Sequence, residues 1–127
     1  MLNNMQNRMT NKVLMGKFID FVSEYLEITT PVNIRLTNDR EDITTTAYYD
    51  LFNYKICVYI KDRAIMDVMR SLAHEMVHHK QNEDGKLSGN AEDGSDGSPI
   101  ENEANAVAGV IMRLFGKQNP EIYTNNK

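Results

Sequence analysis

Two histidines and a glutamate near the middle of the chain form its clearest chemical pattern. The segment His74-Glu75-Met76-Val77-His78 has the HExxH spacing. Residues four apart on a helix lie one turn apart on the same face, so both imidazoles can reach one zinc ion at about 2.0–2.1 Å. Zinc lowers the pKa of a bound water toward about 7, and the neighbouring carboxylate of Glu75 can then take its proton. The motif predicts zinc bound by His74 and His78, with Glu75 as catalytic base.

A catalytic zinc site normally has three protein ligands and one open position, so the motif requires a third ligand. Two carboxylates, Glu101 and Glu103, lie at the start of the last predicted helix. We assign Glu103 as the third ligand, because small residues follow it and would let this helix pack closely on the zinc helix. Glu101 is assigned to the first turn, where a carboxylate interacts favourably with the helix dipole.

The elements that must position these residues follow from the spacing of apolar side chains. Apolar residues spaced three and four apart predict three helices. The first spans about residues 11–27, and the second runs from an N-cap at Asp62 to about residue 80. The third begins near Ile100 and ends at Gly116, a suitable C′ residue. Alternation predicts strands at 32–37, 43–49 and 54–60, and short connections favour an antiparallel meander. The stretch 82–99 is predicted to be a long loop.

The expected fold class is therefore α+β. It comprises an N-terminal helix, a three-stranded antiparallel sheet, the HExxH helix and a C-terminal glutamate helix. We expect one domain over residues 1–127, with residues 1–10 and 118–127 flexible.

Composition is typical of an ordinary globular protein and excludes several classes. The 127 residues are 41% hydrophobic and 25% charged, which suits one domain with a core. A net charge of −4 disfavours a nucleic-acid-binding surface, which is strongly basic. The single cysteine permits no internal disulfide and fits a reducing compartment. Neither a signal peptide nor a membrane span is expected, so we expect a cytoplasmic protein, in the host cell if the source is viral. Its oligomeric state stays open.

The motifs resemble the gluzincin group of zinc metallopeptidases, in which a downstream helical glutamate completes HExxH. Residues 70–78, RSLAHEMVH, are similar to the ImmA/IrrE-like branch, as are residues 101–108, ENEANAVA, which match its Glu-x-Glu-Ala-Asn-x-Phe-Ala pattern except at Val107. Residues 111–113 also depart from its usual Leu-Met-Pro ending. The resemblance spans about residues 54–115. It implies a minimal metallopeptidase, like stand-alone minigluzincin or phage-encoded forms, acting on a protein or peptide substrate.

Other hypotheses stay open. A fourth protein ligand would indicate an inactive, zinc-stabilised interaction module. A regulatory peptidase that cuts one specific partner is a third hypothesis. An extended peptide could add to a sheet edge, for which residues 44–46 are a candidate.

Three neighbouring features are interpreted as structural. His79 lies about 100° around the helix from His78 and is expected to be a surface or partly packed side chain rather than a ligand. Cys57 is expected to pack within its strand, because the sequence around it lacks the glycine-bearing motif of a deformylase-like site. The acidic stretch 92–96 lacks the ligand spacing of a calcium loop and is interpreted as solvated.

Overall fold

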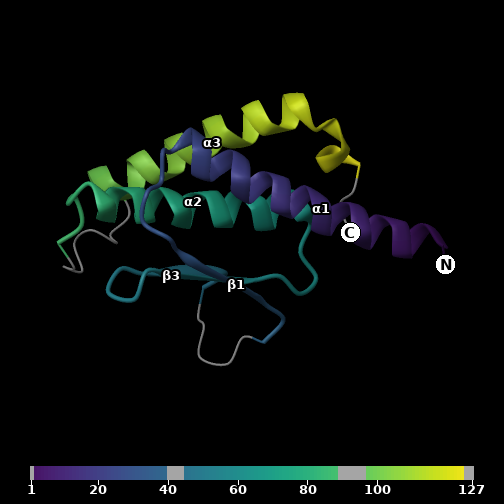
Figure 1. The fold of residues 1–127 in the computed structure, drawn as a ribbon, viewed down its shortest axis with the longest axis horizontal. Helices are drawn as coiled ribbons and strands as arrows, with labels where there is room; N and C mark the ends of the chain where they lie inside the picture. The colour runs from purple at the N-terminus through teal and green to yellow at the C-terminus, as the bar shows by residue number, and fades with distance from the viewer. Residues whose placement is uncertain (1, 40–44, 89–96, 125–127) are drawn as a thin grey trace.

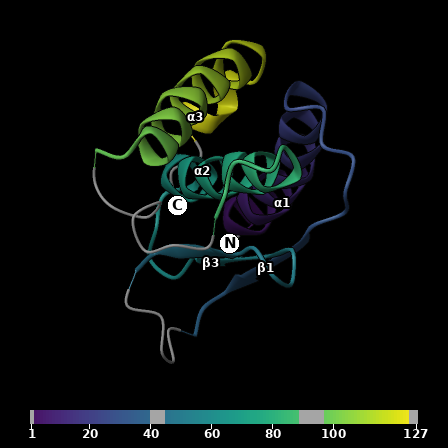
Figure 2. The same ribbon diagram turned by 90° about the vertical axis from the view of Figure 1, so that its left-hand side faces the viewer.

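The computed structural model describes residues 2–39, 45–88 and 97–124, with the backbone alone for residues 2–10. In chain order the elements are α1 (Leu2–Tyr25), β1 (Asn33–Thr37), β2 (Ala47–Asp50), β3 (Lys55–Tyr59), α2 (Ile65–Glu83), α3 (Pro99–Gln118) and the 3-10 helix η2 (Pro120–Tyr123). The three α-helices lie on one side of the sheet, with α2 next to it and α3 farther away (Figure 1, Figure 2). The predicted α+β class is confirmed.

The sheet is mixed, which corrects the predicted antiparallel meander. Its strand order is β1-β3-β2, with β3 antiparallel to β2 and parallel to β1. The central strand has Ile56, Cys57 and Val58 buried in succession. Cys57 points to the opposite face from Ile56 and Val58, and on that face it lies between Arg35 and Tyr48 of the two flanking strands.

Several element boundaries also differ from the sequence-based ones. Helix α1 begins at Leu2 and so includes most of the segment predicted to be flexible. Helix α2 follows Ala64, whose side chain makes no cap, while the predicted N-cap, Asp62, has a left-handed φ of 59°. Helix α3 continues through Gly116, and Asn119 takes the C-cap position. Residues 43–44 of the predicted second strand lie outside the described residues, as do residues 89–96 of the predicted loop, which include the acidic stretch 92–96.

Gly116 has a packing role instead of ending the helix. A Cβ built at this buried position would lie 2.2 Å from the hydroxyl oxygen of Tyr123. Glycine therefore leaves room for the end of the Tyr123 side chain against α3. Ile122 of η2 is fully buried and closes this end of the core.

Helix α2 is the centre of the core. Its apolar side chains pack on the sheet on one side and on α1 and α3 on the other, and those buried are Ile65, Val68, Met69, Leu72, Ala73, Met76 and Val77. Phe18 of α1 meets Phe115 of α3 edge to face, with ring centroids 5.0 Å apart. In the part of the chain that the structure describes, no helix combines the length and apolarity needed to cross a bilayer.

Glu83, the last residue of α2, hydrogen bonds to the segment that connects α1 to β1. Its Oε1 accepts hydrogen bonds from the backbone N–H of Thr29, at 2.9 Å, and of Thr30. Its side chain is only 7% exposed. Burial raises the pKa of this carboxyl, but the two backbone donors outweigh it, and the net pKa is lowered from the ordinary 4.5.

A lowered pKa in the folded state makes this contact sensitive to acid. The unfolded chain takes up the proton first, so the stabilisation is present above pH 4.5 and is lost as pH falls through the folded pKa. We expect Glu83→Gln to cost about 1–3 kcal/mol of unfolding free energy at pH 7 and less at pH 3. Urea unfolding across this pH range measures it, with the exposed Glu24→Gln as control. An equal loss at both pH values would contradict the assignment.

Candidate metal centre

Three side chains from two helices converge on one point. His74 and His78 belong to α2 and Glu101 to the first turn of α3. The two histidine Nε2 atoms are 3.1 Å apart, and they lie 3.0 Å and 2.9 Å from the two carboxylate oxygens of Glu101. A tetrahedral zinc with ligands at about 2.0–2.1 Å separates neighbouring ligand atoms by about 3.3 Å. The three donor groups are thus already spaced to hold one such ion.

The tautomer of His78 is set by a buried glutamine. The side-chain amide nitrogen of Gln81 donates to the Ile100 carbonyl at 3.1 Å and to Glu103 Oε1 at 2.8 Å. Its oxygen therefore faces His78 Nδ1, 2.7 Å away, and that nitrogen must carry the proton. With Nδ1 as the N–H, Nε2 faces the Glu101 carboxylate. Two acceptors at 2.9 Å repel unless a cation or a proton lies between them, so this arrangement fits a metal ion.

The pKa of His74 is lowered, which favours the neutral form that can bind a metal. Burial, and then the charge of neighbouring His78, lower its pKa, although Glu101 acts in the opposite direction. The side chain of Asn105 hydrogen bonds to His74 as well. Asn105 follows Glu101 by four residues, so both lie on the face of α3 that meets α2.

Glu75 lies beside the histidines and is 8% exposed. Burial, and then the negative charge of Glu101, raise its pKa to about 8. A cation at the candidate centre would offset both effects and favour the carboxylate. Such an environment suits a group that accepts a proton and later returns it.

The predicted placement of Glu103 beside the histidines is corrected to Glu101. Glu103 instead accepts the hydrogen bond from Gln81, and its Oε2 lies 3.6 Å from Lys86 Nζ. It therefore supports His78 indirectly, through Gln81. The sequence-based candidates did not include Gln81, although it lies on α2 three residues after His78 and so shares its face.

His79 and Cys57 have structural roles. His79 is fully buried, which is deeper than expected, and its Nε2 donates to the Thr30 carbonyl while its Nδ1 accepts from the Tyr49 hydroxyl, both at 2.7 Å. With both ring nitrogens engaged, it joins α2 to the sheet. Cys57 is buried in β3, as predicted.

A hollow of about 270 Å³ lies between the centre and the sheet edge. Strand β2, α2 and α3 all contribute to its lining, which consists of Thr46, Ala47, Asp67, Arg70, Ser71, His74, Glu75 and Asn105. In the sheet that the structure describes, β2 is an edge strand, and the Ala47 carbonyl accepts a hydrogen bond from the Thr45 hydroxyl at 2.7 Å. Tyr59 N–H donates to the Thr46 carbonyl at 2.9 Å, and antiparallel bonding alternates, so the polar groups of Ala47 and Tyr49 point away from β3. The predicted edge at 44–46 lies partly outside the described residues.

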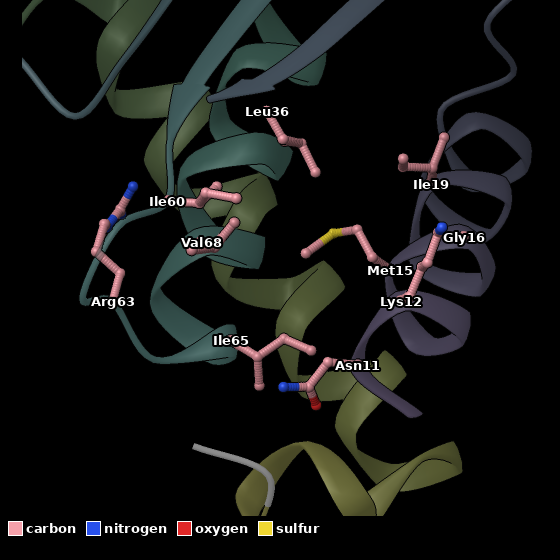
Figure 3. Close-up of a pocket in the computed structure, with 10 residues that line it drawn as sticks. All are labelled: Asn11, Lys12, Met15, Gly16, Ile19, Leu36, Ile60, Arg63, Ile65 and Val68. Atoms are coloured by element: carbon pink, nitrogen blue, oxygen red, sulfur yellow. The ribbon is translucent and has the colours of Figure 1, made fainter. Parts of the chain in front are cut away.

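A larger cavity, of about 400 Å³, lies between α1 and the start of α2. Apolar side chains such as Met15, Ile19 and Leu36 point into it, with Lys12 and Arg63 near its rim (Figure 3). None of the three converging residues lines this cavity, so the chemistry of the candidate centre belongs to the smaller, polar hollow.

Comparisons of the chain with protein-family models, with curated proteins and with solved structures each found no match. The triad of His74, His78 and Glu101 on α2 and α3 is compatible with a zincin-like site, in which a glutamate completes HExxH.

Proposed function

We propose that this chain is a zinc-dependent peptidase in which His74, His78 and Glu101 hold the metal and Glu75 is the general base. The observation that carries the proposal is the convergence of three donor groups at 2.9–3.1 Å, with the glutamate of HExxH beside them. Among the residues that the structure describes, the group has three members. Three protein ligands leave a coordination position for water or substrate, which favours an enzyme over a closed structural site.

The chain's own residues supply the proton transfers. When bound, zinc polarises a carbonyl oxygen and acidifies water. Glu75 takes a proton from the attacking water at a carboxylate oxygen and later delivers it to the leaving amine nitrogen. Burial and Glu101 raise the pKa of Glu75 to about 8, and the charge of a bound cation would act against both effects, so that the carboxylate is available to accept the proton.

The open edge of β2 supports a peptide as substrate. The outward N–H of Ala47 and the outward N–H and carbonyl of Tyr49 can pair with the backbone of an extended chain, while the Ala47 carbonyl already accepts from the Thr45 hydroxyl. The same strand lines the hollow with His74 and Glu75. A peptide added at this edge would therefore pass directly by the candidate centre.

Removal and return of zinc tests the function. We expect the chelator-treated protein to bind one zinc ion per chain and to cleave members of a peptide library in proportion to its zinc content. Mass spectrometry of the native complex gives the stoichiometry, and product analysis gives the cleavage. Zinc binding without cleavage of any peptide would support the interaction module instead.

Gln81 should tune the metal affinity without touching the metal. We expect Gln81→Leu to weaken zinc binding about 10–100-fold, because the His78 tautomer loses its hydrogen-bond partner. Competition with a chromophoric chelator measures the affinity, and nitrogen NMR of the histidine rings reports the tautomer. The exposed Gln118→Leu is the control. Unchanged affinity and tautomer would contradict the role of Gln81.

A further inference from the structure

The hollow beside His74 has an uneven distribution of charge. Besides Glu75, the described lining of the hollow contains one acidic residue, Asp67. Arg63, which lies outside the lining, pairs with Asp67: its Nε lies 2.9 Å from Asp67 Oδ2. The positive charge of Arg63, outside the hollow, therefore offsets the negative charge of Asp67.

Arg70 supplies the remaining positive charge. Its side chain is exposed, and within the described ranges it forms no ion pair and no side-chain hydrogen bond. It precedes His74 by four residues, so its side chain lies on the same helical face, one turn away. Arg70 thus lines the hollow together with His74 and Glu75.

The other polar groups add hydrogen-bond donors. Ser71 Oγ accepts from Arg63 Nη2 at 2.6 Å, so its own hydroxyl hydrogen is available to an acceptor in the hollow. Asn105 also lines the hollow, and its amide carries two donor hydrogens. Donors around one cation suit an anionic ligand that accepts several hydrogen bonds.

We infer that this hollow binds a carboxylate of the peptide substrate next to the scissile bond, with Arg70 as the specificity-determining residue. The inference rests on the proposed peptidase function and names its substrate class. The planar guanidinium matches a carboxylate in two parallel hydrogen bonds, whether the carboxylate belongs to an Asp or Glu side chain or to a free C-terminus.

Matched peptides test the inference. One series carries Glu, Gln or Lys at each position flanking the cleaved bond, and each peptide is made with a free and with an amidated C-terminus. We expect zinc-loaded wild type to cleave the Glu peptide with about tenfold higher kcat/KM than the Gln peptide, and Arg70→Glu to prefer Lys. Arg113→Glu, at an exposed position on α3, makes the same charge change and should behave as wild type. Faster cleavage of free than of amidated peptides, whichever residue flanks the bond, assigns the carboxylate to the chain end.

A binding measurement separates failure of this inference from failure of the proposed function. If wild type cleaves all peptides equally and Arg70→Glu does not change their ratio, the carboxylate site is overturned while the peptidase stands. If no peptide is cleaved, the peptidase fails, and calorimetry of the same peptides with zinc-loaded Glu75→Gln protein decides the site. Tighter binding of Glu than of Lys peptides, lost in Arg70→Glu, supports the site; equal binding overturns it.

Discussion

Replacing Glu101 with glutamine should lower the affinity of the chain for zinc about a thousandfold. The binding free energy of a protein zinc site, about 10–16 kcal/mol, is shared among three or four ligands, so loss of one anionic ligand removes several kcal/mol. Glu101 is the carboxylate whose two oxygens lie 3.0 Å and 2.9 Å from the histidine nitrogens. Metal-competition titration at fixed pH measures the change.

Glu103→Gln is the matched comparison. It makes the same substitution two residues away on α3, and the new side-chain oxygen can still accept the hydrogen bond from Gln81. We expect its zinc affinity to fall by less than about tenfold. A larger loss in Glu103→Gln than in Glu101→Gln would restore the sequence-based ligand and refute the observed orientation of α3.

Replacing Glu75 with glutamine should remove hydrolysis and keep the metal. Loss of a positioned general base lowers the rate about 10²–10⁴-fold. Glutamine has the same shape as the protonated acid, which is the form that burial favours at this position, so folding should be retained. The measurements are zinc stoichiometry and kcat on the best peptide from the library.

Full activity in Glu75→Gln would exclude Glu75 as the base and leave a metal site without the proposed mechanism. Loss of zinc together with activity would show that Glu75 acts on the site's structure rather than on the proton. The exposed Glu24→Gln serves as the control for both measurements, since α1 contributes nothing to the triad.

The sequence predicted the two histidines of the candidate centre but not its glutamate, although the sequence did contain a signal for Glu101. The HExxH spacing is local to one helix, so His74 and His78 could be paired without knowledge of the fold. The choice between two glutamates depended on the rotation of α3. Its buried residues include Ala104, Ala108, Ile111 and Phe115. Glu101 precedes Ala104 by three residues and so lies on the same buried face of α3. Glu103 lies about 200° around the helix from Glu101.

The direction of β1 could not be predicted in the same way. Alternation of apolar and polar residues shows which side chains share a face of a strand, but not which strand is its neighbour or whether the two run parallel. The short β2–β3 connection did favour the hairpin that is observed.

Gln81 was missed because a polar residue on a helix is usually exposed, whereas the side chain of Gln81 is 2% exposed.

The division of the triad between two helices has a thermodynamic consequence. Because α2 supplies two donors and α3 the third, a bound ion would cross-link two helices that the chain itself connects through residues 84–98. An unfolded chain has no such preformed site, so binding free energy adds to folding free energy. Each tenfold rise in free zinc above the dissociation constant would add about 1.4 kcal/mol of stability. The metal would thus act as a reversible cross-link, and the resistance of the chain to proteolysis would rise and fall with the free zinc concentration.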